Sequence, residues 1–436
     1  MGNYMMIIKS LVFVSMLTLT LITPVYAADW SMFKNDISRS GYTGDTVSPP
    51  LTLKWTKDLG FETDSSPVIV NNVLYIGTTF GIHALDILSG NELWRYHTNG
   101  FVKSVPAVAN DVVYFGANDR KFYALNAKDG TLLWINDASL DGYTASAAVT
   151  NNMVYAMPKD GSFYAFDIMN GKIIWSTLIG KASESSPAVG EGIIAFGTDS
   201  GDIVALDVST GKEKWHYNTG AIEIKSSPVI ADGTLFVGSN DGSVYAITTD
   251  KGALKWKYST SNNVESSPSV RNGVVYFGST DSNFFALDAL TGNIIWKFPN
   301  SGSVLSGPAI SNDIVYFGTR NNFIYALDAN SGKTLWKNST GQNDKDYITS
   351  PAISGNMLFA ATHSGLLFAY SGTVEVSTPA VKETTPLPAA QTASPTVTTV
   401  KPSQTKESPG FEFEFPVLVL LMLAVIGMYR MHRKKK

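Results

Sequence analysis

The chain of 436 residues contains no cysteine. This absence excludes disulfide frameworks, thiolate catalysis, thiolate zinc sites and iron–sulfur clusters. Charged residues make up only 16% of the chain, and the formal net charge is -4. That balance disfavours nucleic acid as a partner, because neutralising phosphates takes clustered Lys and Arg. The five histidines are not spaced as a metal motif, so we expect no metal site.

The first 27 residues predict a secretory signal. An apolar run at residues 11–22 follows Lys9, and Val25-Tyr26-Ala27 has the small residues that a signal peptidase accepts. The run is short for a membrane span and ends near Pro24. We therefore expect removal after Ala27, with a retained membrane anchor as the alternative.

The other end of the chain divides into two parts. Residues 372–409 consist mostly of Thr, Pro, Ser, Ala and Val, a composition that predicts an extended stalk without a core. Residues 410–436 continue a Pro-Gly-Phe motif (409–411) into a short apolar stretch (415–429) and a basic tail. This end resembles the PGF-CTERM signal of archaeal surface proteins, which implies cleavage and a lipid anchor. A retained membrane span is the alternative, and both place the folded part outside the cell, anchored at its surface.

Between the two ends, the sequence repeats with a period near 40 residues. Ser-Ser-Pro, with small changes, recurs at spacings of 39 to 43 residues and ends at Pro67, Pro106, Ala147, Pro187, Pro228, Pro268, Pro308 and Pro351. Eight of the nine tryptophans recur 39 to 41 residues apart, as Trp55, Trp94, Trp134, Trp175, Trp215, Trp256, Trp296 and Trp336. A fixed period of this length indicates a solenoid or a propeller.

Each unit predicts four short strands. In residues 266–298, β-branched and aromatic runs are separated by turns containing Asn-Gly, Asp-Ser and Thr-Gly. The first tryptophan strand (51–55) has no preceding three strands, and the last unit (351–370) ends without a tryptophan strand. Joining them completes eight units and removes free sheet edges. We therefore predict an all-β, eight-bladed β-propeller over residues 28–371, closed by the N-terminal strand.

The repeat also resembles a known family. Residues 205–215 read Ala-Leu-Asp-x-x-Thr-Gly-x-x-x-Trp, which is similar to the tryptophan-docking motif of PQQ-type propellers. The opening Asp-Trp-Ser-Met-Phe at residues 29–33 is similar to the lead-in of that family. The resemblance covers the whole folded region and implies the fold. Its members include quinoprotein dehydrogenases and the assembly lipoprotein BamB. We expect the repeated aspartates and tryptophans to be structural, through turn bonding and packing between blades.

Specificity is expected where the units differ. Three residues before each aligned proline stand Asp64, Lys103, Thr144, Glu184, Lys225, Glu265, Leu305 and Ile348, which we place at one mouth of the channel. A second set of turns contributes Arg120, Lys121, Asp160, Asp241, Arg320 and His363 to the same mouth. The longest connection, after Trp336, adds Tyr347. That connection also begins with the only glycosylation sequon, at Asn338. Solvated turns without a ligand are the alternative.

Two function classes compete. The first is a non-enzymatic module on the cell surface that binds an extracellular protein or glycan. The second, implied by the resemblance, is a quinoprotein dehydrogenase with PQQ, calcium, a catalytic Asp and commonly an adjacent-cysteine disulfide. The absence of cysteine and of long insertions favours the binding module. We therefore predict no catalytic residues and no cofactor, with PQQ and calcium left open, and a monomer.

Overall fold

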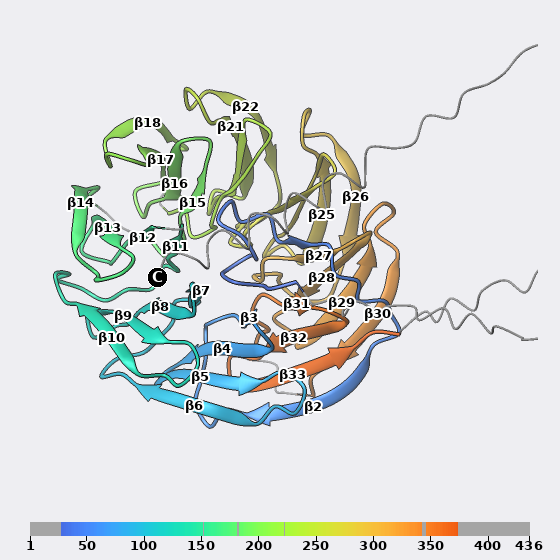
Figure 1. The fold of residues 1–436 in the computed structure, drawn as a ribbon. Coiled ribbons are helices and arrows are strands. Elements are labelled where there is room, and N and C mark those ends of the chain that lie inside the picture. The colour runs from blue at the N-terminus through green and yellow to red at the C-terminus, as the bar shows by residue number, and fades with distance from the viewer. Residues whose placement is uncertain (1–27, 151, 181–182, 222, 342–345, 374–436) are drawn as a thin grey trace, which may run out of the picture. The chain divides into compact units, whose positions relative to one another are not determined.

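The computed structural model describes residues 28–150, 152–180, 183–221, 223–341 and 346–373. The predicted signal and C-terminal tail, and all of the predicted stalk except residues 372–373, lie outside these ranges. The described chain forms eight antiparallel β-sheets arranged as blades around a central axis (Figure 1). The predicted eight-bladed propeller is therefore confirmed.

Blades 1 to 4 follow the chain, each from its inner to its outer strand. Blade 1 contains β3 (Val68–Val70), β4 (Val73–Thr78), β5 (Gly81–Asp86) and β6 (Glu92–His97). Blade 2 contains β7 (Ala107–Ala109), β8 (Val112–Gly116), β9 (Phe122–Asn126) and β10 (Leu132–Asn136). Blade 3 contains β11 (Ala148–Val149), β12 (Met153–Ala156), β13 (Ser162–Asp167) and β14 (Ile173–Leu178). Blade 4 contains β15 (Ala188–Gly190), β16 (Ile193–Gly197), β17 (Asp202–Asp207) and β18 (Glu213–Asn218).

Blades 5 to 7 continue the same order. Blade 5 contains β19 (Val229–Ala231), β20 (Thr234–Gly238), β21 (Ser243–Thr248) and β22 (Leu254–Ser259). Blade 6 contains β23 (Ser269–Arg271), β24 (Val274–Gly278), β25 (Asn283–Asp288) and β26 (Ile294–Pro299). Blade 7 contains β27 (Ala309–Ser311), β28 (Ile314–Gly318), β29 (Phe323–Asp328) and β30 (Thr334–Ser339).

Blade 8 closes the ring. It combines β31 (Ala352–Ser354), β32 (Met357–Ala361) and β33 (Leu366–Ser371) with the N-terminal strand β2 (Thr52–Asp58) as its outer strand. Strand β2 pairs antiparallel with β33, so that Trp55 lies opposite Ala369. One strand was not predicted: β1 (Tyr42–Thr43) adds a parallel fifth strand to β27 of blade 7. The predicted closure by the N-terminal strand is confirmed.

Apolar side chains fill the spaces between adjacent blades. The second and third strands of the blades are almost entirely buried, whereas the outer strands alternate between exposed positions and half-buried or buried ones. This pattern follows from packing each sheet between two others, which removes both faces of its inner strands from water. The cores of neighbouring blades form continuous clusters, for example one around Tyr276, Phe284 and Phe317.

The repeated tryptophans join each blade to the next. Trp94 on β6 donates from Nε1 to the carbonyl of Ala127 in blade 2 at 3.0 Å. Its ring covers Gly130, which has a φ of 72°, and the equivalent glycines of six other blades have φ values of 67° to 71°. A Cβ added to Gly130 would lie 2.6 Å from the Trp94 ring, so glycine supplies both the left-handed turn and the space for docking. These repeated residues therefore pack neighbouring blades against each other, as the sequence predicted.

The residues before β2 cross the axis of the ring, as the dark-blue chain shows in Figure 1. We call residues 28–47 the axial segment. Its carbonyls accept N–H bonds of 2.7–3.2 Å from the inner strands of six blades, namely from Ile69, Val108, Val189, Ile230, Val270 and Ile310. The segment therefore ties the inner strands together from within the channel.

Two cations of the axial segment are buried. Arg39 is completely buried and donates to the carbonyls of Phe33, Pro187, Ser146 and Ala147 at 2.7–3.3 Å. Lys34, 2% exposed, donates from Nζ to the carbonyls of Ser267 and Pro308. Burial lowers the pKa of Lys34 well below its ordinary value and that of Arg39 to about 9. Backbone carbonyls thus replace water around both charges.

Candidate functional site

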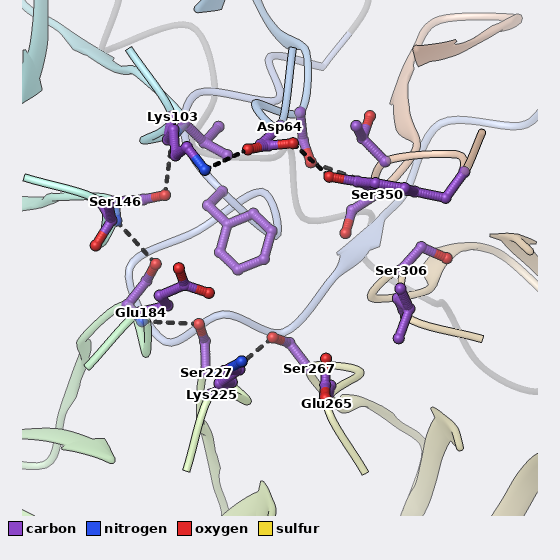
Figure 2. A pocket seen from close by; sticks show the side chains of 18 of the residues that line it. Asp64, Lys103, Ser146, Glu184, Lys225, Ser227, Glu265, Ser267, Ser306 and Ser350 are labelled. Atoms are coloured by element: carbon purple, nitrogen blue, oxygen red, sulfur yellow. Dashed lines mark hydrogen bonds and ion pairs between the residues drawn. The ribbon is translucent and has the colours of Figure 1, made fainter. Parts of the chain in front are cut away.

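The eight positions that vary before each aligned proline meet at one cavity of about 360 Å³ on the propeller axis. All eight line it, and so does Tyr347. Figure 2 shows Asp64, Lys103, Glu184, Lys225 and Glu265 around this space, each from a different blade. The repeat places one side chain per blade at the same distance along the axis. The cavity wall is therefore a ring of eight non-identical residues.

The second set of predicted turns does not line this cavity. Arg120 and Arg320 are exposed and are not among the residues that line the cavity, so the structure does not bring them to the ring. Asp160 accepts bonds from Ser139 and the Leu140 N–H in its own pair of turns. Only His363 of this set reaches the cavity residues, through Asp64. These turns join the second and third strands of a blade, so they lie one strand farther from the axis than the connections that carry the ring.

The Ser-Ser-Pro motif lines the cavity, a role that the sequence analysis did not assign. The second serine of each motif accepts a backbone N–H from the motif of the preceding blade. Six such bonds of 2.8–3.1 Å run around the axis, from Val105 to Ser146, Ser146 to Ser186, Ser186 to Ser227, Ser227 to Ser267, Gly307 to Ser350 and Ser350 to Ser66. The ring is interrupted where Val105 and Gly307 replace the serine. The motif therefore joins blades and also supplies a hydroxyl-rich wall.

Asp64 is the centre of a charged cluster at one side of the cavity. Its Oδ2 lies 2.9 Å from Lys103 Nζ, and its Oδ1 lies 2.7 Å from His363 Nδ1 and accepts a bond from the Tyr347 hydroxyl. The Tyr347 and His363 rings stack, with centroids 4.8 Å apart. Burial alone would raise the pKa of Asp64, but the bonds from Tyr347 and Lys103 and the nearby positive charges lower it. Asp64 is therefore ionised and already paired.

The opposite side of the cavity carries freer carboxylates. Lys225 Nζ lies 3.5 Å from Glu223, and this carboxylate with Glu265 and Glu184 raises the pKa of Lys225 despite its partial burial. Glu184 and Glu265 make no hydrogen bond or ion pair within the described ranges. These two side chains are therefore available to accept hydrogen bonds from a ligand.

The axial segment closes one end of the cavity. Phe33 is the residue of this segment that lines the space, and it is half-buried. The Arg39 guanidinium lies over the Phe33 ring, 5.5 Å from its centroid, and does not itself line the cavity. The sequence gives no signal for this arrangement, because the lead-in residues do not belong to the repeat.

Neither a metal site nor a membrane span is visible in the described part. Those residues contain no group of three or more His, Asp or Glu side chains arranged to hold a metal ion. Within the same ranges, no helix is long and apolar enough to cross a membrane. The side chain of Asn338, the predicted glycosylation position, is half-buried and donates to the Tyr370 hydroxyl at 2.8 Å. Its modification stays a prediction.

The Asp64 cluster predicts a pH-dependent stability. Because the pKa of Asp64 is lowered on folding, its ionised form stabilises the protein above the ordinary Asp pKa of about 4. This contribution is lost as the pH falls through the lowered value. We expect Asp64→Asn to reduce the free energy of unfolding by about 1–2 kcal/mol at neutral pH. The difference from the parent should shrink below about pH 4 in urea titrations. Asp250→Asn, at an exposed turn, is the control, and an equal loss at every pH would contradict the assignment.

Comparison with known proteins supports the fold and leaves two classes of relative. BamB of Shigella dysenteriae is 36% identical over 197 residues, which cover 40% of this chain and 50% of that protein. The dehydrogenase subunit of the quinone alcohol dehydrogenase of Gluconobacter oxydans is 30% identical over 128 residues, or 25% of this chain and 17% of that protein. The chain thus spans half or less of the length of these curated relatives.

Solved structures divide in the same way. The chain matches 99% of BamB from Moraxella catarrhalis with a TM-score of 0.63 and 18% identity, over 74% of its own length. It matches 81% of the quinohemoprotein alcohol dehydrogenase of Comamonas testosteroni with a TM-score of 0.68 and 15% identity, over 79% of its length. At these identities the likeness concerns the fold. The profile of the family "Outer membrane protein assembly factor BamB" matches residues 47–148, 137–226 and 220–392, and the chain belongs to this family of PQQ-like propellers.

Proposed function

We propose that this protein is a non-enzymatic binding module whose axial cavity receives an extracellular partner, a protein or a glycan. One observation carries the proposal: the position that varies from unit to unit lies in the same cavity in all eight blades. The tryptophans and the turn glycines recur in the units because neighbouring blades need the same packing. Different side chains at equivalent positions of one concave surface, carried by a constant framework, support a recognition site.

The predicted location is part of this proposal. The signal-like residues 1–27 and the PGF-like end at residues 410–436 support export and anchoring at the cell surface. Residues 372–409, between the propeller and the PGF-like end, support a stalk that keeps the propeller, as a monomer, away from the membrane. The BamB relatives support a scaffolding role within this class, although they match only part of the chain.

Site-specific photo-cross-linking on intact cells tests the proposal. We expect a photoreactive residue at Glu184, which is exposed and lines the cavity, to capture one recurring protein or glycan. The same residue at Leu290, which is 73% exposed on an outer turn, should give no recurring product. Capture from position 290 alone, or no product from position 184, would count against binding through the cavity.

Quinoprotein relatives make a dehydrogenase the second candidate, which requires that the cavity residues fit the cofactor. PQQ is a tricarboxylate and is held with calcium in the dehydrogenases that this family resembles. The lining offers three carboxylates and two ammonium groups, and one of these, Lys103, is already paired with Asp64. No cluster of acidic side chains among the described residues provides calcium ligands. The lining therefore does not fit the cofactor.

A cofactor titration separates the two candidates. We expect no change in the absorption spectrum of PQQ when purified protein and calcium chloride are added, because repulsion from Glu184 and Glu265 disfavours an anionic ligand. Primary alcohols should likewise give no dye reduction. Stoichiometric PQQ binding, followed by alcohol-dependent dye reduction, would favour the dehydrogenase over the binding module.

A further inference from the structure

We infer that the axial cavity binds an uncharged saccharide, with one sugar ring packed on Phe33 and its hydroxyl groups bonded to the serine and threonine side chains of the wall. The inference rests on the proposed function, since it names the ligand class of the same cavity. Four features of the lining lead to it: the aromatic floor, the hydroxyl donors, two unpartnered threonines and the balance of charge.

The floor favours an uncharged ring. A sugar ring has a face of C–H groups that packs on an aromatic face with little loss of hydration. Phe33 supplies the aromatic group, and Arg39 lies over its ring at 5.5 Å. Because that guanidinium already interacts with the aromatic quadrupole, an ammonium ligand on the same ring would meet a like charge. The floor therefore suits a neutral ligand better than a cationic one.

The wall presents hydroxyl donors that the protein does not use. In the six serines of the inter-blade ring, Oγ accepts a backbone N–H, and no acceptor for the hydroxyl hydrogen occurs in the described part of the chain. A hydroxyl has one donor and two acceptor sites, so each serine keeps one donor for water or a ligand. Ligand hydroxyls, which both donate and accept, match such a wall.

Two threonines of the wall also have hydroxyl groups without a hydrogen-bond partner among the described residues. Thr144 is 9% exposed and Thr349 is 4% exposed, and both line the cavity. The Oγ1 atoms of both lack any hydrogen-bond partner among the described residues. A buried hydroxyl without a partner costs about 1–3 kcal/mol. Both Oγ1 atoms are inaccessible to solvent, so a ligand satisfies them only when rotation about χ1 turns the hydroxyl into the cavity. Thr144 and Thr349 come from blades 3 and 8, so these unsatisfied hydroxyl groups lie on different sides of the wall.

The charged side chains of the cavity wall disfavour strongly ionic ligands. Three carboxylates and two ammonium groups line the space, and two of the carboxylates, Glu184 and Glu265, have no partner among the described residues. An anionic sugar would be repelled by this pair, whereas a neutral sugar hydroxyl can donate to either carboxylate in a charge-assisted bond. The cavity of about 360 Å³ lies within the ~300–1,000 Å³ range of small-ligand pockets and accommodates a terminal sugar residue.

A glycan array with neutral, amino, uronic and sulfated glycans, probed with the full mature protein, tests the inference. We expect binding to neutral glycans, with an affinity that changes little between low and high salt because no net ligand charge is screened. Phe33→Ala should weaken binding by about tenfold or more, and Phe33→Tyr should retain it. Ser227→Ala should weaken binding, while Ser209→Ala, at an exposed turn, should not.

The outcomes separate this inference from the proposed function. Binding confined to charged glycans, or neutral binding unaffected by both Phe33→Ala and Ser227→Ala, would overturn the saccharide site. If the array shows no binding while position 184 captures a recurring protein, the cavity binds a protein and only the saccharide inference fails. Loss of both signals would remove the proposed function as well. Because Phe33→Ala can disturb the axial segment and Ser227→Ala removes the acceptor of the Ser186 N–H, binding by both variants is measured well below their melting temperatures, with circular dichroism showing that the fold is kept.

Discussion

Replacing Arg39 by alanine is expected to destabilise the propeller by about 3–5 kcal/mol, because it leaves carbonyls from three parts of the ring without their donor. The guanidinium joins Phe33 in the axial segment to Pro187 in blade 4 and to Ala147 in blade 3. Among the described residues, no surface ion pair makes as many buried bonds to separate blades. Denaturant unfolding of parent and variant measures the loss.

The controls distinguish hydrogen bonding from charge. Arg39→Lys keeps the charge but cannot reproduce the planar set of donors, so it should recover less than half of the lost stability. Arg95→Ala removes an arginine whose side chain is 56% exposed and which, among the described residues, pairs with Glu92 alone, so it should cost about 0–1 kcal/mol. An Arg39→Ala variant as stable as Arg95→Ala would mean that the axial segment does not hold the blades together.

The repeated part of the fold could be predicted from the sequence because every unit shows the same pattern of strands and turns. Ser-Ser-Pro and Trp positions set the period, and the incomplete first and last units predicted that β2 pairs with β33. The ring of variable residues followed from the same alignment, since equivalent positions in a closed repeat lie at equivalent distances from the axis. Asp64 and Glu265 meet at the cavity for this reason.

The parts outside the repeat could not be predicted in the same way. A charged residue such as Arg39 is normally exposed, and nothing in the sequence shows that carbonyls from other blades surround it. Arg120 and Arg320 do not line the cavity, because their turns join the second and third strands and so lie one strand farther from the axis than the ring, which alignment alone does not show. The hydrogen-bond role of Ser186 also depends on its neighbour, because the bond joins two units rather than residues within one.

The glycines beneath the tryptophans provide the second large effect. Gly130→Ala should destabilise the protein by about 3–4 kcal/mol, of which ~1–2 kcal/mol is the cost of a side chain in the left-handed region. The remainder arises because the new Cβ would lie 2.6 Å from the Trp94 ring and must displace it from the blade interface. Displacement would also break the Trp94 Nε1 bond to the Ala127 carbonyl.

Gly273→Ala isolates these two contributions. Gly273 has a φ of 73°, against 72° for Gly130, but has no atom within 4 Å of the position of an added Cβ. It should therefore lose only the backbone contribution of ~1–2 kcal/mol. The difference between the two alanine variants measures how strongly one tryptophan joins two blades. Equal losses would mean that the glycine is needed for the turn alone, and that the 40-residue tryptophan repeat contributes little to closing the ring.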